Sequence, residues 1–76
     1  MDKKFVKKLQ GKKLSTLVEK YGFCIDDFMD ENTNEMSRAQ YEMLKNHKVT
    51  IEFLENDFNY NYIVTVENFD AYCVYN

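Results

Sequence analysis

The sequence predicts an α+β fold, in which N-terminal helices pack on a three-stranded antiparallel β-meander. Two observations support this prediction. Apolar residues recur at helical spacing up to about residue 46, and they alternate with polar residues after residue 48. The connections between the alternating segments are short, which is typical of antiparallel strands. Because the chain has only 76 residues, we expect one small domain over residues 1–76.

Two helices are predicted before Gly22. The apolar stripes of these segments differ in direction by roughly 120° on a straight helix. Gly11 lies between them and is a poor helix residue, so we expect the chain to break or bend there. Gly22 follows the second helix, at about residues 14–21, where a left-handed conformation suits a helix end. The first stripe is made of Phe5, Val6 and Leu9, and the second of Leu14, Leu17, Val18 and Tyr21.

Two further helices and three strands follow. A short helix is predicted from Ile25 to Glu31, and a longer one begins at Ser37 and runs to about Asn46. Ser37 and Gln40 have the spacing of a capping box. The strands are predicted at 49–53, 60–67 and 71–75, with turns at 56–59 and 68–70. Since helices cover only one face of a small sheet, some aromatic side chains are expected on the other face or at the edges.

The charge of the chain is divided between two parts. Residues 1–25 carry seven lysines and two acids, whereas residues 26–76 carry three basic groups and eleven acids. The net charges of the two parts are +5 and −8, although the whole chain carries only −3. Such a division implies two electrically distinct surfaces, and it bears on partners rather than on fold.

The acidic part combines carboxylates with tyrosines. Tyrosine is frequent at binding hot spots because it offers a large, rigid contact area with a polar tip. Acids around tyrosines suit a basic partner surface. An ordinary role as core and rim residues of a small aromatic-rich domain is the alternative interpretation. The predicted partner-binding residues are Asp26, Asp27, Asp30, Glu31, Glu52, Glu55, Asp57, Tyr60, Tyr62 and Tyr72.

The lysines of the basic part give an alternative, phosphate-binding site. Lys4, Lys7 and Lys8 share one face of a helix, where they are placed to contact phosphates. No arginine and no interleaved exposed aromatic accompanies them. A solvated face that balances the acidic part is therefore the other interpretation of these lysines.

Residues 14–31 resemble a helix-turn-helix in their spacing. The core positions and the turn glycine of that motif are matched by Leu17, Tyr21, Gly22, Phe23 and Phe28. The resemblance places four acids, between residues 26 and 31, in the helix that would read DNA. Because acids repel DNA phosphates, we predict two ordinary helices joined by a glycine turn, and no binding of duplex DNA by this segment.

The sequence carries no motif for catalysis, a cofactor or a metal. His47 is the only histidine, and no sequence feature links it to a nucleophile or an orienting acid. Asp30 begins a stretch that matches three positions of a calcium loop, but Glu35 and Tyr41 stand where that loop needs glycine and a bidentate glutamate. We therefore predict a protein that is not an enzyme and has no cofactor or metal.

The sequence also indicates a compartment. No apolar run reaches the roughly 18 residues of a membrane helix, and the lysine-rich start lacks the apolar stretch of a signal peptide. We expect a cytoplasmic protein without a membrane partner. In that compartment Cys24 and Cys73 are expected to be small buried side chains rather than a disulfide.

In size, acidity and lack of motifs, the chain resembles the small inhibitor proteins that phages and mobile elements encode, such as anti-CRISPR proteins. The resemblance implies a protein that occupies the basic, nucleic-acid-binding groove of a partner protein in the cytoplasm of an infected bacterium. Two alternatives stay open. One is a nucleic-acid accessory protein that uses the N-terminal lysines. The other is a structural protein that self-associates, for instance as a homodimer, through the edge strand near Ala71 to Tyr75.

Overall fold

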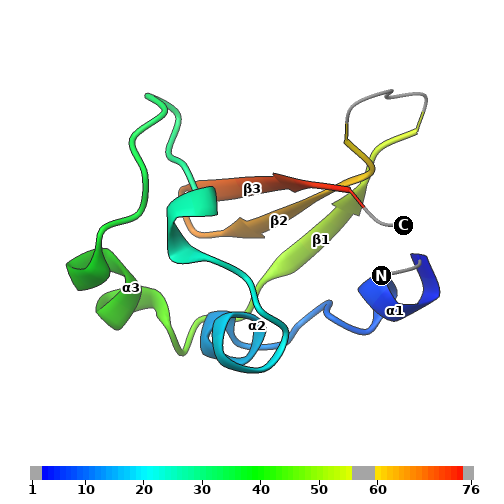
Figure 1. Cartoon of the computed structure of the whole chain (residues 1–76), viewed down its shortest axis with the longest axis horizontal. Coiled ribbons are helices and arrows are strands. Elements are labelled where there is room, and N and C mark those ends of the chain that lie inside the picture. Colours follow the sequence, from blue (N-terminus) through cyan, green and yellow to red (C-terminus); the bar gives the residue numbers. More distant parts are fainter. Residues whose placement is uncertain (1–2, 56–59, 75–76) are drawn as a thin grey trace.

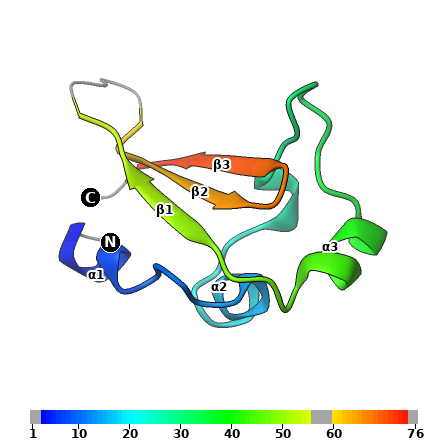
Figure 2. The same ribbon diagram turned by 180° about the vertical axis from the view of Figure 1, so that it is seen from behind.

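The computed structural model describes residues 3–55 and 60–74, and it confirms the α+β fold (Figure 1). The strands form an antiparallel sheet in the order β1-β2-β3, the predicted meander. Figures 1 and 2 show the α-helices on the same side of this sheet. In chain order, the elements of the described residues are α1 (Lys3–Lys7), α2 (Leu14–Lys20), the 3-10 helix η1 (Ile25–Asp27), α3 (Arg38–Leu44), β1 (Thr50–Phe53), β2 (Tyr62–Val66) and β3 (Phe69–Cys73).

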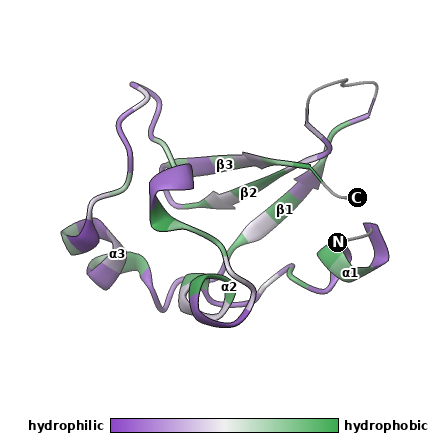
Figure 3. Cartoon of the chain, viewed as in Figure 1, coloured by the Kyte–Doolittle hydropathy of each residue, from purple (hydrophilic) through white to green (hydrophobic). Residues whose placement is uncertain are grey.

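The core lies between the helices and one face of the sheet. Burial along β2 alternates with a period of two, so every second side chain of this strand faces the helices. In Figure 3 the long connection between η1 and α3 is mostly hydrophilic, although Phe28 and Met36 near its two ends are buried in the core. The buried apolar residues are Val6, Leu9, Leu14, Leu17, Phe28, Met36, Tyr41, Val49, Tyr62, Val64, Val66, Phe69 and Ala71.

The predicted break at Gly11 is confirmed. Gly11 has a φ of 79°, a left-handed conformation that glycine adopts without steric cost. Its N–H donates to the Val49 carbonyl at 3.0 Å, and the Val49 N–H donates to the Lys12 carbonyl at 2.8 Å. Further backbone bonds join residues 11–15 to residues 45–49. The segment between α1 and α2 therefore runs beside the residues that connect α3 to β1.

The predicted end of α2 is confirmed, but the helix predicted over residues 25–31 is wrong. Gly22 has a φ of 77°, and the chain turns back so that the Phe23 N–H donates to the Leu17 carbonyl at 3.0 Å. Beyond it, only the three residues of η1 are helical, and Phe28 is already extended. The segment 14–31 therefore holds one α-helix and one 3-10 turn.

Pairing with the sheet explains why residues after η1 are extended. Met29 forms an isolated antiparallel bridge with Asp70 of β3, and its N–H and carbonyl bond Asp70 at 3.0 and 2.9 Å. These bonds satisfy the backbone of Met29 at the sheet edge, which makes helical bonds unnecessary there. Met29 therefore already occupies the outer edge of β3 at Asp70. The self-association alternative uses the edge of this same strand.

The start of α3 is as predicted. Ser37 Oγ accepts from the Gln40 N–H at 3.1 Å, and Gln40 Oε1 accepts from the Ser37 N–H at 2.8 Å. Met36 and Tyr41 flank this capping box and are both buried, the arrangement of a hydrophobic staple. The box fixes where the hydrophilic connection ends and where α3 begins.

The strand boundaries differ slightly from those predicted. The turn between β2 and β3 is at Glu67 and Asn68, not at residues 68–70, so β3 begins at Phe69. Glu67 has a φ of 50°, which is typical of a two-residue hairpin turn. The predicted turn at 56–59 lies outside the described residues. The cysteine prediction is wrong for Cys24, which is exposed, and Cys73 is only partly buried; both thiols are free.

Candidate functional site

The sheet face opposite the helices presents alternate residues of all three strands. Strand geometry places them there, because their neighbours in the chain face the core. The pairing register arranges them in two rows across the sheet. We call this surface the outer face; its rows are Glu52, Ile63 and Tyr72, and Thr50, Thr65 and Asp70.

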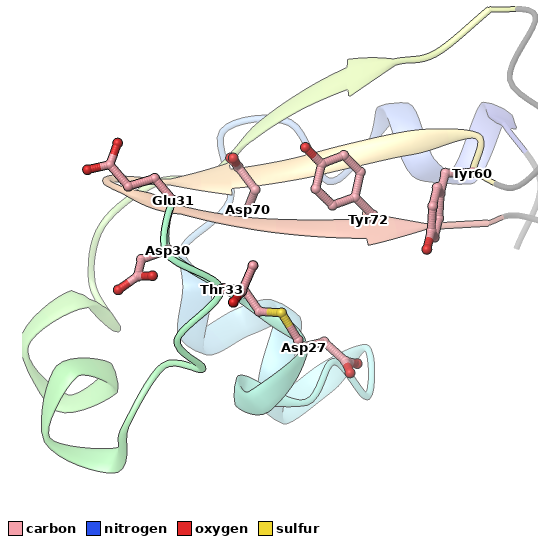
Figure 4. Close-up of a pocket in the computed structure, with 8 residues that line it drawn as sticks. Asp27, Asp30, Glu31, Thr33, Tyr60, Asp70 and Tyr72 are labelled. Atoms are coloured by element: carbon pink, nitrogen blue, oxygen red, sulfur yellow. The ribbon is translucent and has the colours of Figure 1, made fainter.

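A hollow of about 500 Å³ adjoins the β3 side of the outer face. One wall comes from the sheet and the other from η1 and the connection that follows it. Figure 4 shows the two tyrosines at one end, Asp30 and Glu31 at the other, and Asp70 between them. We call this site the acidic hollow; it is lined by Asp27, Met29, Asp30, Glu31, Thr33, Tyr60, Asp70 and Tyr72.

Local bonding at Asp30 gives the connection its shape. The Asp30 carboxylate accepts from the backbone N–H groups of Asn32 and Asn34, both at 2.9 Å. These bonds hold the pKa of Asp30 below its usual range, and the bond from the Asn34 N–H has the larger effect. Thr33 lies at the tip of this loop with a φ of 63°. The Asp30 carboxylate therefore stabilises the loop and also contributes negative charge to the hollow.

Two tyrosines form the aromatic part of the hollow. The ring centroids of Tyr60 and Tyr72 lie 5.5 Å apart, and the rings are tilted by 55°. Tyr72 is 54% exposed and Tyr60 is 43% exposed. Such a pair is stabilised beyond its area burial, and it leaves a large aromatic surface to solvent.

Asp70 stands beside these rings on the same strand face. Residues i and i+2 of a strand lie about 7 Å apart and face the same side of the sheet, so Asp70 and Tyr72 are neighbours on the outer face. The Thr65 hydroxyl donates to Asp70 Oδ1 at 2.9 Å and fixes the carboxylate. This acid was not among the predicted site residues, although the alternation of β3 places it with Tyr72. Met29 and Thr33 were also missed, because loop pairing has no local signal.

The structure brings half of the predicted partner-binding residues into one site. Glu52 lies on the outer face in the same row as Tyr72. Asp26 and Glu55 are exposed but do not line the hollow. Asp57 lies outside the described residues. Those in the hollow are Asp27, Asp30, Glu31, Tyr60 and Tyr72.

The prediction for Tyr62 is wrong. Its side chain is 1% exposed, and it occupies an inward position of β2 between the sheet and the helices. Burial raises the pKa of its hydroxyl well above the usual range. Tyr62 therefore belongs to the core, and a partner has no access to it.

The alternative site lies at another end of the molecule. Lys4, Lys7 and Lys8 are exposed. Figure 1 shows α1 and the connection between η1 and α3 at opposite ends of the long axis. The lysines of α1 are thus distant from the acids of this connection, whereas Lys3 lies over the ring of Phe53 in β1, the chain neighbour of Glu52.

The single histidine also has a partner at the surface. His47 Nδ1 lies 2.7 Å from Glu67 Oε1, so the segment that follows α3 is joined to the β2–β3 turn. Beside this pair is a second hollow of about 350 Å³, and Met43, which is 78% exposed, is part of its wall. None of its lining residues is a nucleophile placed against His47.

Among residues 3–55 and 60–74, no group of three or more His, Cys, Asp or Glu side chains is arranged to hold a metal ion. In the same ranges, every helix is too short or too polar to cross a membrane. Comparison of the chain with protein-family models, curated proteins and solved structures finds no match.

Proposed function

We propose that the protein is a non-enzymatic inhibitor or adaptor that binds a basic partner protein through the acidic hollow and the adjoining outer face. One observation carries this proposal. Four carboxylates and two half-exposed tyrosines line a single hollow, and its described lining includes no lysine or arginine. Such a surface attracts a basic partner and offers aromatic contact area once the partner has arrived.

The chemistry of the partner follows from this surface. Basic grooves on proteins commonly hold nucleic acid, whose phosphates they neutralise. An acidic surface that fits such a groove competes with the nucleic acid for it. This is the mode of action that the resemblance of the chain to anti-CRISPR proteins implies, and the same resemblance implies a place in the cytoplasm of an infected bacterium. The proposed partner is a nucleic-acid-binding effector of that host.

The test compares two variants with equal and opposite changes of charge. Asp27→Lys with Glu31→Lys cancels the net charge of the four carboxylates in the hollow, and Lys4→Glu with Lys7→Glu makes the opposite change on the exposed face of α1. Asp30 is left intact because its carboxylate shapes the loop. Each variant is measured against the partner that the wild-type protein captures from a bacterial lysate.

The decisive measurement is displacement of labelled nucleic acid from that partner. We expect the wild-type protein and the lysine variant to displace it, and the acidic variant to lose at least tenfold in potency. If the lysine variant fails and the acidic variant succeeds, the competitor function is wrong. The accessory function of the N-terminal lysines would then be favoured.

A further inference from the structure

The outer face is a sheet face that the α-helices leave uncovered, and its most exposed large side chain is an aromatic. Tyr72 is 54% exposed, and its ring lies against Tyr60. Figures 1 and 2 show the α-helices on the opposite side of the sheet. Glu52 and Asp70 are the charged residues of this face, and both are acids. The charge of the face therefore calls for a positively charged occupant.

We propose that the outer face at Tyr72 docks an arginine side chain of a partner protein, in preference to lysine. The inference rests on the proposed function and names the side chain that the acidic surface recognises. The guanidinium lies on the Tyr72 ring and bonds the Asp70 carboxylate, and Asp27 adds negative charge from the facing wall of the hollow.

Aromatic stacking distinguishes the two basic side chains. A guanidinium is flat and weakly hydrated, so it can stack on the face of a tyrosine ring. Its N–H groups point outward in the plane of the guanidinium, where they can still donate hydrogen bonds to other groups. A lysine ammonium is a compact, strongly hydrated charge that gains less from such a surface. Tyr72 supplies the ring at an exposed position.

The carboxylate of Asp70 is placed to complete the contact. Asp70 and Tyr72 are next neighbours on one strand face, about 7 Å apart along β3. The Thr65 hydroxyl occupies one site on Oδ1, and a carboxylate has about four acceptor sites in all. Asp70 therefore accepts a guanidinium N–H without losing the bond that fixes it. Charge-assisted bonds of this kind are the strong ones.

The chain contains the same combination of groups within α3. The guanidinium of Arg38 lies 5.3 Å from the ring centroid of Tyr41. One of its nitrogens is 3.5 Å from a carboxylate oxygen of Glu42. One arginine thus contacts both a tyrosine and an acid in this fold, and the outer face offers a tyrosine and an acid without an arginine.

Other occupants fit this surface less well. A second copy of the chain brings seven exposed or partly exposed lysines from its first 25 residues but no arginine there, and its single Arg38 is already in contact with Tyr41 and Glu42. A metal ion lacks a ligand set among the described residues. Nucleic acid is repelled by the carboxylates. An arginine of another protein is the occupant that both the charge and the ring favour.

The experiment titrates the full-length protein with two peptides and follows backbone amides by two-dimensional NMR. One peptide has eight residues of alternating glycine and arginine, and the other has lysine in place of arginine. We expect the arginine peptide to bind about fivefold more tightly, the ratio that a cation–π contact of about 1 kcal/mol gives. The amides of Asp70 and Tyr72 should shift at the same peptide concentration.

Variants assign the preference to the ring. Tyr72→Leu should abolish the preference for arginine, whereas Tyr72→Phe, which keeps the ring, should retain it. Glu19→Gln, at an exposed position of α2, is the control for the loss of an acid elsewhere, to be compared with Asp70→Asn. The Glu19 variant should bind as wild type, and the Asp70 variant should lose affinity for the arginine peptide.

The outcomes separate this inference from the proposed function. Equal binding of both peptides, lost on reversal of Asp27 and Glu31, contradicts the arginine preference and leaves the acidic binding surface in place. A preference that persists in Tyr72→Leu places the arginine elsewhere and overturns the inference. If neither peptide binds, both proposals fail. A salt-sensitive dimer that Lys4→Glu with Lys7→Glu dissociates would make a second copy the occupant instead.

Discussion

Tyr62 and Tyr72 lie on opposite faces of the sheet, so replacing each with alanine separates stability from binding. The Tyr62 side chain is 1% exposed, and the Tyr72 side chain is 54% exposed. We expect Tyr62→Ala to lower the free energy of unfolding by about 3–5 kcal/mol, the usual cost of truncating a buried aromatic. Tyr72→Ala should cost about 1 kcal/mol, mainly from its lost contact with the Tyr60 ring.

The difference is large on the scale of this protein. At about 0.05–0.15 kcal/mol per residue, a chain of 76 residues has a stability of about 4–11 kcal/mol. Tyr62→Ala therefore removes a large fraction of it, and some preparations will be partly unfolded. Since 1 kcal/mol shifts the Tm of a domain this size by about 4–8 °C, the expected decreases are at least about 12 °C for Tyr62→Ala and at most about 8 °C for Tyr72→Ala.

The assay is urea unfolding followed by far-UV circular dichroism, with the slope of the transition compared between variants. Tyr62→Phe is the matched control, because it keeps the buried ring and should retain most of the stability. Equal losses for the two alanine variants would refute the assignment of inner and outer faces. Partner binding is then a meaningful readout for Tyr72→Ala but not for Tyr62→Ala.

Four further predictions test separate parts of the structure. Ser37→Ala should lower the free energy of unfolding by about 1 kcal/mol, through loss of the helix cap, and no change in thermal melting would contradict the capping box. A maleimide should modify Cys24 quickly and Cys73 slowly at neutral pH, because burial raises the pKa of the Cys73 thiol; equal rates are expected only in urea. The pKa of Asp30 is lowered by folding, so its charge stabilises the loop fully above about pH 3.9, and the contribution is lost as the pH falls through the lower folded value. The chemical shift of the Asn34 backbone amide reports the protonation of Asp30, and a midpoint of its pH dependence well above about pH 4 would disprove that bonding. In gel shifts at physiological salt, duplex DNA should bind no more tightly than about micromolar, and a nanomolar complex would favour the N-terminal lysines as the working surface.

Features of the fold with a local signal could be predicted from the sequence. The change from helical to strand spacing at Val49 marks the α+β fold, and the helix boundaries at Gly22 and Ser37 depend on neighbouring residues. The break at Gly11 has a local signal in the glycine itself, although backbone bonds to Val49 also hold it. The extended conformation of Met29 could not be predicted in this way. It depends on pairing with Asp70, which lies 41 residues away in the sequence.

The candidate site could be predicted as a composition but not as a geometry. Alternation along β2 shows that Tyr62 and Ile63 face opposite sides, but it does not show which side the helices cover. Tyr62 was for this reason assigned to the surface although it is in the core. Asp70 belongs to the hollow because η1 and the following loop pack against β3. Long-range packing decides both of these assignments.

The backbone bonds between residues 11–15 and 45–49 also determine how the charges of the molecule are arranged in space. They attach the lysine-rich start of the chain to the body, so that α1 stays at the opposite end from the acidic connection, in a molecule 34 Å long (Figure 1). Opposite charges held at two ends give the protein a permanent electric dipole moment. In the field of a basic partner, this dipole turns the acidic end forward before the surfaces touch. The rate of productive encounter should therefore exceed that of a randomly oriented approach, and the gain should fall as ionic strength rises.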